Sequence, residues 1–345
     1  MKNYYITTSS LAGSCTIPAS KSQSIRALLF ATMANGVSTI ENYLPSPDIA
    51  AMVAACRQLG AAIQQTDDKL LISGVNRLLQ TPDDVIDAGN SGQVLRFIAC
   101  LAGLQSNYMV ITGDASIRQN RPVGPLIEAL PKLGVLCESL QGNGYAPLVL
   151  KGPFSASETR LSGEDSQPVS GLLMAAAFAE GITKIHVRNP GEKPWIGLTL
   201  QWFDRFNIPY QNQEFEVYQV SGGVEIDGFR YRVPGDLSSL SFPLVAALIT
   251  QSEIVIHDVD MNELQGDKAI VAVLQSMGAQ IDIDADAQTL TVSSGKGLHG
   301  VDIDINDFID CVAILAVVGC CASGTTRISG AAIAREKESD RIAAI

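Results

Sequence analysis

The chain has 345 residues, of which 46% are apolar and 17% charged, and its formal net charge is −12 at pH 7. This length suggests about two domains with sizeable cores, and the acidic balance argues against nucleic acid as a partner. No apolar run approaches the roughly 18 residues of a membrane span and the N-terminus lacks the hydrophobic region of a secretory signal, which is typical of a cytoplasmic enzyme.

Five times along the chain a short polar motif runs directly into an apolar helix. The motifs are PASKSQSIR (18–26), DAGNSGQVLR (87–96), GEDSQPVSG (163–171), PGDLSSLSF (234–242) and DINDFID (304–310). Helix N-termini carry unpaired N–H groups and partial positive charge, so they bind anions readily. A fold that repeats such starts can gather several of them around one ligand. This favours small molecules that bear phosphate and carboxylate groups.

Each motif opens a longer repeat. After the first helix, most copies continue with a β-branched strand, a second amphipathic helix and further strand-like segments. The strands are expected at 36–44, 107–113, 181–187, 252–258 and 324–330, the second helices at 52–63, 126–137, 200–208 and 271–281, and later strands at segments such as 68–74 and 288–294. The period is roughly 70 residues, longer than the units of solenoids. It predicts an α/β fold (α+β by some schemes) of duplicated βαβαββ units, about three in each domain.

The fifth copy of the repeat is short. Its second helix is expected to begin in REKESDRIAAI (335–345), and the sequence stops there inside an apolar face, without a cap or following strands. A domain seldom ends on half an amphipathic helix. The sequence therefore predicts a C-terminally truncated protein, with its last unit missing, that is inactive as given.

The cysteines and histidines are scattered along the chain. No two cysteines form a CxxC pair, and the three histidines lie far apart in sequence. We expect buried, reduced thiols, no metal site and no cofactor. The cysteines are at positions 15, 56, 100, 137, 311, 320 and 321, and the histidines at 186, 257 and 299.

Taken one at a time, the polar motifs have plain structural explanations. The serines of 21–26 can cap a helix, and Gly89–Gly92 can be a turn. The charges of 336–341 can form surface pairs one helical turn apart, and Trp195 can pack in the core.

Together and in this order, the motifs resemble the 3-phosphoshikimate 1-carboxyvinyltransferase (5-enolpyruvylshikimate-3-phosphate synthase) family over essentially the whole chain. The matching motifs are KSxSxR (21–26), SPD (46–48), GNSG with Arg96 (89–96), RP (121–122), SQ (166–167), KPW (193–195), GDxSS (235–239), QGD (265–267), Asp310 and KESDR (337–341). The resemblance implies an enolpyruvyl transferase-like fold with three βαβαββ units in each of two domains, and an N-terminal strand that joins the second domain. The expected domains are 16–235, with three complete units, and 1–15 plus 236–345, incomplete at its C-terminus.

The resemblance implies a reaction of the shikimate pathway, in aromatic amino-acid biosynthesis. The enolpyruvyl group of phosphoenolpyruvate is transferred to the 5-hydroxyl of shikimate 3-phosphate by addition and elimination, and phosphate is released. Both substrates carry a phosphate and a carboxylate, so the site needs many donors and cations. Protons move on and off during the reaction, which requires positioned acids and bases. The expected partners are these two small molecules, without nucleic acid or membrane, and the expected protein is a monomer.

The resemblance also implies roles for individual residues. Three are expected to be catalytic: Lys21 as a cation between both substrates, Asp310 as the base facing the 5-hydroxyl, and Glu338 in proton exchange with the methylene. The expected substrate-binding residues are Lys21, Ser22, Arg26, Asn90, Gly92, Arg121, Ser166, Gln167, Lys337 and Arg341.

The binding residues are expected to divide between the two substrates. The family pattern implies that Ser22 and Arg26 hold the shikimate carboxylate. Ser166 and Gln167 are expected to contact the shikimate phosphate and ring, with Lys337 adding charge nearby. Phosphoenolpyruvate is then expected to bind Arg121, Arg341 and the backbone at Gly92.

Several positions depart from the common family pattern. Asp165 and Glu192 stand where many members place serines that touch the shikimate phosphate, Ile333 replaces a frequent asparagine, and Gln93 a usual threonine. An acid facing a phosphate is repulsive, so both carboxylates are expected to turn toward a neighbouring Lys or Arg, such as Lys193.

Two other functions stay open. The enolpyruvyl transferase that acts on UDP-N-acetylglucosamine pairs its lysine with asparagine and carries a reactive cysteine before the Arg-Pro position. Here Ser22 follows Lys21, and the loop 116–120 contains no cysteine. Because such a nucleophile is seldom replaced within one mechanism, these two departures argue against this function. A non-catalytic anion-binding protein is the second alternative.

Overall fold

The computed structural model describes residue 5, residues 7–293, residue 295 and residues 297–345. Residues 1–4 and 6, part of the predicted second domain, and Ser294, the end of the predicted strand 288–294, lie outside the described residues. The chain packs into two units, which we call the long unit (19–233 with 332–344) and the short unit (the described residues up to 18, with 234–331 and 345).

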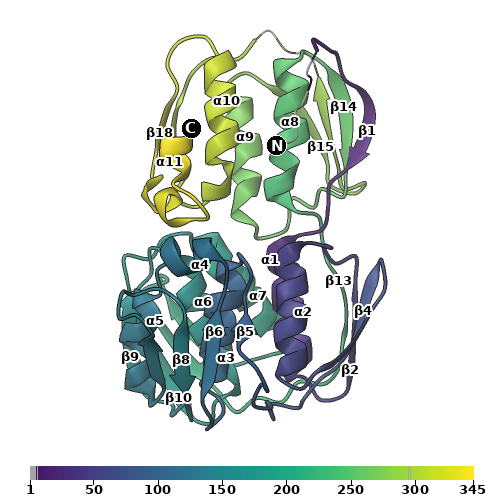
Figure 1. Ribbon diagram of the computed structural model, residues 1–345. Coiled ribbons are helices and arrows are strands. Elements are labelled where there is room, and N and C mark those ends of the chain that lie inside the picture. The colour runs from purple at the N-terminus through teal and green to yellow at the C-terminus, as the bar shows by residue number, and fades with distance from the viewer. Residues whose placement is uncertain (1–4, 6, 294, 296) are drawn as a thin grey trace. The chain divides into compact units, whose positions relative to one another are not determined.

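The long unit, all of whose residues are described, contains three four-stranded sheets of one topology (Figure 1). In each sheet a parallel pair of strands is extended by two antiparallel strands. In sheet order the strands are β13 (Arg230–Arg232), β2 (Val37–Glu41), β4 (Lys69–Ser73) and β3 (Ala62–Gln65); β5 (Ile86–Asp87), β6 (Met109–Thr112), β8 (Leu148–Lys151) and β7 (Leu136–Ser139); and β9 (Glu158–Ser162), β10 (Ile182–Arg188), β12 (Val217–Ser221) and β11 (Tyr210–Gln213).

Two principal helices accompany each sheet. The first follows a polar start motif, and the second follows the next strand, which confirms the predicted βαβαββ unit. In chain order the helices of the long unit are α1 (Lys21–Met33), α2 (Pro47–Gln58), α3 (Gly92–Ala102), the short α4 (Ala115–Gln119), α5 (Gly124–Ala129) with the 3₁₀ turn η1 (Leu130–Leu133), α6 (Ser166–Phe178) and α7 (Lys193–Arg205).

The two units exchange strands at their sequence boundaries. Strand β13 enters the first sheet of the long unit beside β2, where the repeat requires a strand before α1. The strand that does precede α1, β1 (Ala12–Thr16), instead pairs in parallel with β14 (Glu253–His257) in the short unit. This confirms the expectation that the N-terminal strand joins the second domain.

The described part of the short unit repeats the same topology. One sheet has the order β1, β14, β16, β15, and a parallel pair joins β17 to β18. The remaining elements, in chain order, are α8 (Leu237–Ile249), η2 (Gly266–Lys268), α9 (Ala269–Ser276), β15 (Gln280–Asp284), β16 (Thr289–Ser293), β17 (Asp302–Asp304), η3 (Ile309–Cys311), α10 (Val312–Cys321) and β18 (Arg327–Ser329).

The last residues of the chain pack differently from the predicted division. The segment with η4 (Ala332–Glu336) and α11 (Arg341–Ala344) belongs to the long unit, whereas the expected division puts these residues in the domain 236–345. The physical reason is a buried ion pair between Lys337 and Glu192, 2.8 Å apart. A buried ammonium group needs such a partner, and the partner lies 145 residues away.

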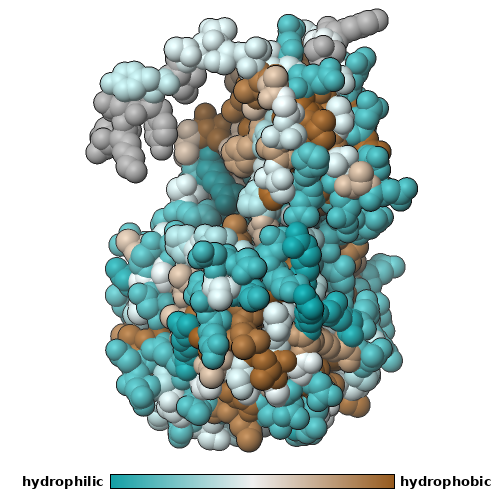
Figure 2. All heavy atoms as spheres, turned by 90° about the vertical axis from the view of Figure 1, so that its right-hand side faces the viewer, coloured by the Kyte–Doolittle hydropathy of each residue, from teal (hydrophilic) through white to brown (hydrophobic). Residues whose placement is uncertain are grey.

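On the face shown in Figure 2, polar side chains cover most of the surface and apolar ones form smaller patches. Among the described helices, none is long and apolar enough to cross a membrane. All seven cysteines are described and free; four are buried, but Cys15, Cys320 and Cys321 are exposed, which corrects the expectation of buried thiols.

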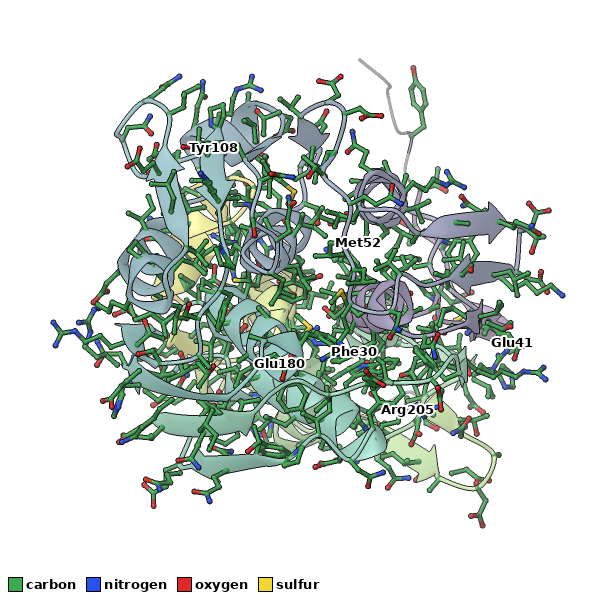
Figure 3. The ribbon with its side chains drawn as sticks, turned by 90° about the horizontal axis from the view of Figure 1, so that it is seen from below. Phe30, Glu41, Met52, Tyr108, Glu180 and Arg205 are labelled. Atoms are coloured by element: carbon green, nitrogen blue, oxygen red, sulfur yellow. The ribbon has the colours of Figure 1, made fainter. Side chains whose placement is uncertain are left out.

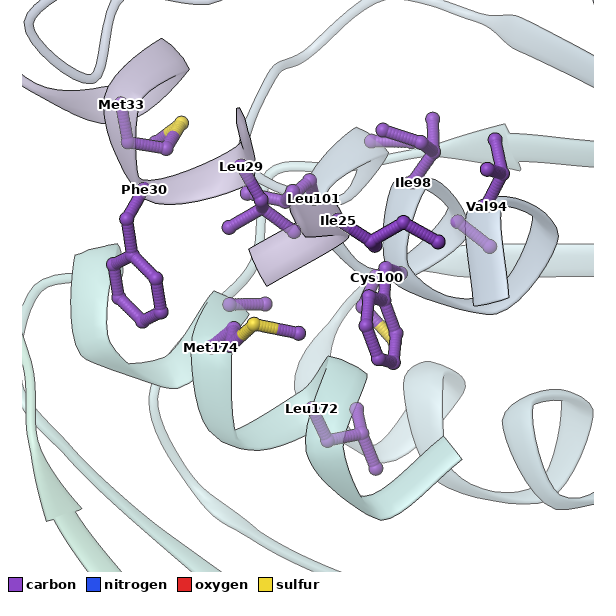
Figure 4. Close-up of a cluster of buried hydrophobic side chains, with 14 of the residues drawn as sticks. Ile25, Leu29, Phe30, Met33, Val94, Ile98, Cys100, Leu101, Leu172 and Met174 are labelled. Atoms are coloured by element: carbon purple, nitrogen blue, oxygen red, sulfur yellow. The ribbon is translucent and has the colours of Figure 1, made fainter. Parts of the chain in front are cut away.

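The core of the long unit lies among the three helices that follow the start motifs. A helix that is apolar on all sides must be buried, and α1, α3 and α6 are buried along nearly their whole length. Phe30 stacks on Trp202, with ring centroids 5.2 Å apart, whereas Tyr108 is 60% exposed. In Figure 3 Phe30 accordingly lies inside the unit and Tyr108 at its periphery. Figure 4 shows part of this core, with buried side chains from all three helices: Ile25, Leu29 and Phe30 of α1, Val94, Ile98 and Leu101 of α3, and Leu172 and Met174 of α6.

Candidate active site

The starts of α1, α3 and α6 are capped as their sequences predict. The caps are Ser20, Ser91 and Asp165, whose side-chain oxygens accept from a backbone N–H two or three residues later. Such caps leave the other N–H groups of the first turn available. The start motifs are therefore true helix N-termini, each able to attract an anion.

Side-chain hydrogen bonds bring these three starts together. Gln93 on α3 donates to the hydroxyl of Ser22 on α1 over 2.9 Å. Arg96 on α3 donates to the Oε1 of Gln167 on α6 over 2.7 Å. Three of the five predicted motifs thus meet at one place in the long unit, while those before α8 and α10 belong to the short unit.

Gly92 is the point of closest approach. A Cβ atom at this position would lie 2.8 Å from an Nη1 atom of Arg96, 3.1 Å from the Oε1 of Gln167 and 3.2 Å from the Nη1 of Arg121. Both arginines are nearly completely buried. The Nε of each has no hydrogen-bond partner among the described residues. Two buried guanidinium groups with unused donors therefore lie beside the first turn of α3, at a glycine where no side chain covers the backbone. This arrangement suits an anion.

Arg121 and Arg341 share one carboxylate. Glu338 accepts from Arg121 over 2.8 Å with one oxygen and from Arg341 over 2.9 Å with the other. Burial by itself raises the pKa of Glu338, but the two arginines outweigh it and lower that pKa to about 2. Glu338 is thus held ionised between the two expected phosphoenolpyruvate ligands.

Ser166 and Lys337 share a second carboxylate. Glu192 accepts from the backbone N–H and the hydroxyl of Ser166, each at 3.0 Å, and from Lys337 Nζ at 2.8 Å. All three residues are buried. Burial raises the pKa of Glu192, and the opposing effect of Lys337 does not cancel it.

The third carboxylate, Asp165, faces Arg96 at 3.1 Å. Burial opposes its ionisation, but Arg96, Lys337 and Arg121 prevail and the pKa of Asp165 is lowered. The expectation that the two acids turn toward neighbouring cations is confirmed, with Arg96 and Lys337 as the cations.

Arg26 uses most of its hydrogen-bond donors within the protein, whereas the family resemblance implies that it binds substrate. It donates to the hydroxyls of Thr199 and Ser170 and to the carbonyls of Ser22 and Trp195, over 2.8–3.4 Å. A guanidinium has five N–H donors, so at most one is left for a ligand. Burial lowers the pKa of Arg26 to about 9.

The remaining expected residues are more open or lie elsewhere. Lys21 begins α1, is 41% exposed and lies 3.8 Å from Asp48. Asn90 is exposed on the turn before α3. Asp310 is exposed on η3 of the short unit, so the long unit alone does not contain it.

Arg96 and Gln93 are two site residues without an expected role, although Arg96 belongs to a matching motif and Gln93 departs from the family pattern. The available signal was helical spacing, because Arg96 lies one turn after Gly92 and therefore points back toward the same helix end. Among the described residues, no three His, Cys, Asp or Glu side chains gather as metal ligands would.

Comparison with known proteins points to one family. The family model described as EPSP synthase (3-phosphoshikimate 1-carboxyvinyltransferase) matches residues 6–345. A protein of this name from Chlamydia caviae is 41% identical over 348 residues, covering 100% of this chain and 77% of that protein. Another from Acetivibrio thermocellus is 38% identical, covering 97% of this chain and 78% of its own length.

Solved structures show the same fold. EPSP synthase from Acinetobacter baumannii superposes with a TM-score of 0.80 at 27% identity, over 97% of this chain and 77% of that one. The enolpyruvyl transferase NikO from Streptomyces tendae has a TM-score of 0.72 at 15% identity, over 92% of this chain and 75% of that one, which is a likeness of fold alone.

Proposed function

The chain belongs to the EPSP synthase (3-phosphoshikimate 1-carboxyvinyltransferase) family, and on this premise we propose that it transfers the enolpyruvyl group of phosphoenolpyruvate to the 5-hydroxyl of shikimate 3-phosphate. Phosphate leaves in the second half of this addition and elimination. The observation that carries the proposal is the cradle at Gly92, where the buried Arg96 and Arg121 face a helix N-terminus. It has the charge and the donors that an anionic substrate requires.

Phosphoenolpyruvate binds in this proposal at Gly92, Arg121 and Arg341. Glu338 now neutralises both arginines, so the substrate's anionic groups replace it there. A carboxylate released from two cations regains a higher pKa. Substrate binding therefore converts Glu338 from a fixed counter-ion into a group that can carry the proton of the methylene.

Shikimate 3-phosphate binds at the starts of α1 and α6. Ser22, Ser166 and Gln167 form hydrogen bonds with this substrate. Lys337 supplies a positive charge beside it, in addition to that of Lys21. Arg26 contributes mainly by fixing Ser22 and the neighbouring helices, since most of its donors are already used. Lys21 supplies charge between the substrates, and Asp310 acts as the base toward the 5-hydroxyl.

Calorimetry with shikimate 3-phosphate tests the binding half of the proposal. We expect binding by the wild-type chain and loss of binding in Lys21→Ala, with unchanged thermal unfolding, because a partly exposed lysine supplies charge rather than packing. No binding at millimolar ligand by the folded wild-type chain would contradict the proposal. Binding of UDP-N-acetylglucosamine instead would favour the related transferase.

Turnover is tested as phosphate release from phosphoenolpyruvate. Because the chain covers 77% of the Chlamydia caviae relative, the assay compares the chain with a fusion that adds the uncovered part of that relative. Turnover with shikimate 3-phosphate supports the proposal, whereas binding without turnover in both proteins favours the anion-binding alternative. The monomeric state and the cytoplasmic location stay predictions.

A further inference from the structure

The buried carboxylate of Glu192 occupies a complete set of anion donors. Its Oε2 accepts from both the backbone N–H and the hydroxyl of Ser166, and its Oε1 accepts from Lys337 Nζ. Only 2% of Glu192 is exposed. A helix N-terminus, a hydroxyl and an ammonium group together form the kind of site that proteins use for phosphate.

The backbone holds Glu192 in this position. Its φ of 48° and ψ of 39° lie in the left-handed region, which a residue with a Cβ atom seldom adopts. The preceding residue, Gly191, donates its N–H to the carbonyl of Gly163 over 2.9 Å. This bond ties the start of α7 to the loop before α6 (Figure 1). The carboxylate therefore reaches Ser166 from a fixed turn.

The same donors are those that the proposed function gives to the acceptor's phosphate. The one backbone N–H and the one hydroxyl proton of Ser166 cannot serve Glu192 and a phosphate at once, and Lys337 would have to divide its charge between them. The nearby Asp165, paired with Arg96, adds a second negative charge to the same surroundings. A phosphate dianion that enters here meets like charge at short range, whereas an uncharged hydroxyl does not.

We propose that Glu192 is a specificity-determining residue: a resident carboxylate that fills the acceptor-phosphate position, so that shikimate 3-phosphate binds only by displacing it. The inference rests on the proposed function. The affinity for shikimate 3-phosphate should therefore exceed the affinity for shikimate by a smaller factor in this chain than in a variant with an uncharged residue at position 192.

Calorimetry on Glu192→Gln and Glu192→Ser tests this inference. Both variants should bind shikimate 3-phosphate on the order of 10- to 100-fold more tightly than wild type, because Lys337 and Ser166 become available and a like charge is removed. Shikimate should bind all three proteins equally. The matched control is Glu164→Gln, which removes the same charge from an exposed side chain two residues before Ser166 and should leave both affinities within about twofold.

Equal affinity of wild type, Glu192→Gln and Glu192→Ser for shikimate 3-phosphate would overturn the inference and leave the proposed function intact. Absence of binding by every folded protein would overturn both. If the variants fail to fold, a structure of the wild-type chain with shikimate 3-phosphate decides. Glu192 withdrawn from the Ser166 N–H supports the inference, and a carboxylate still bonded there, with the phosphate elsewhere, overturns it.

Discussion

At the residue scale, four cations of the site are matched by carboxylates of the same unit. Arg121 and Arg341 share Glu338, Lys337 faces Glu192, and Arg96 faces Asp165. Buried cations without such partners would be costly. In the proposed function, anionic substrates replace these carboxylates and so exchange the internal ion pairs for contacts with their own groups.

Arg26 gives a prediction at this scale. Replacing it by Lys should lower the free energy of unfolding by about 3 kcal/mol, because a lysine cannot reproduce the planar fork and leaves buried acceptors unpaired. Chemical denaturation measures the change. The matched control is Arg160→Lys at a side chain that is 67% exposed, where we expect a change within about 0.5 kcal/mol. An equally small effect at both positions would show that the hydrogen bonds of Arg26 are not structural.

At the scale of elements, the site depends on how closely α3 and α6 approach. Gly171 on α6 faces α3, and a Cβ atom there would lie 2.9 Å from the Sγ of Cys100 and 3.0 Å from the carbonyl oxygen of Arg96. The helices can therefore meet at this point only around a glycine. Their contact sets the distance between Arg96 and Gln167, and thereby the width of the cradle.

Gly171→Ala should move the two helices apart. We expect a loss of about 1–3 kcal/mol in the free energy of unfolding, as for overpacked cores, together with weaker binding of phosphoenolpyruvate. Gly124→Ala is the control, since a Cβ atom at Gly124 meets nothing within 4 Å, and its effect should be slight. Unchanged stability and binding in Gly171→Ala would mean that the contact can relax without cost.

At the scale of the whole molecule, the two units differ in the partners of their buried carboxyl groups. Those of the long unit described above face cations. In the short unit the buried Asp267 accepts from the hydroxyl of Ser238 and the thiol of Cys311. Burial, and then Asp310 and Asp236, raise the pKa of Asp267 well above its ordinary value of 3.8. The folded chain thus keeps this proton to a higher pH than the unfolded chain does.

The linkage predicts how the stability of the short unit depends on pH. As pH rises above 3.8, the unfolded chain loses the Asp267 proton first, so unfolding becomes easier until the folded group has ionised as well. Asp267→Asn should remove this loss of stability. Both tryptophans, Trp195 and Trp202, lie in the long unit. Their fluorescence reports unfolding of the long unit and should therefore not show this pH dependence. Circular dichroism reports both units and should show the loss of stability of the short unit as pH rises. The same pH dependence in the variant would exclude Asp267 as its source.

The sequence by itself determined the repeat, the helix starts and the family. Polar caps before apolar helices and β-branched strands after them are local patterns, and they were enough to predict the βαβαββ unit and the gathering of helix N-termini. Matching motifs in family order then indicated Ser22, Gly92, Arg121, Ser166, Gln167 and Lys337 as site residues. The structure brings all of these into the long unit.

Only the tertiary structure decided which charges meet. Glu192 and Lys337 are 145 residues apart, and Arg26 finds its acceptors Thr199, Ser170 and Trp195 more than 140 residues further along the chain. The exchange of β1 and β13 between the units likewise joins distant segments. No local periodicity records such pairs, because they arise from the packing of whole helices and sheets, and burial then makes each pairing obligatory.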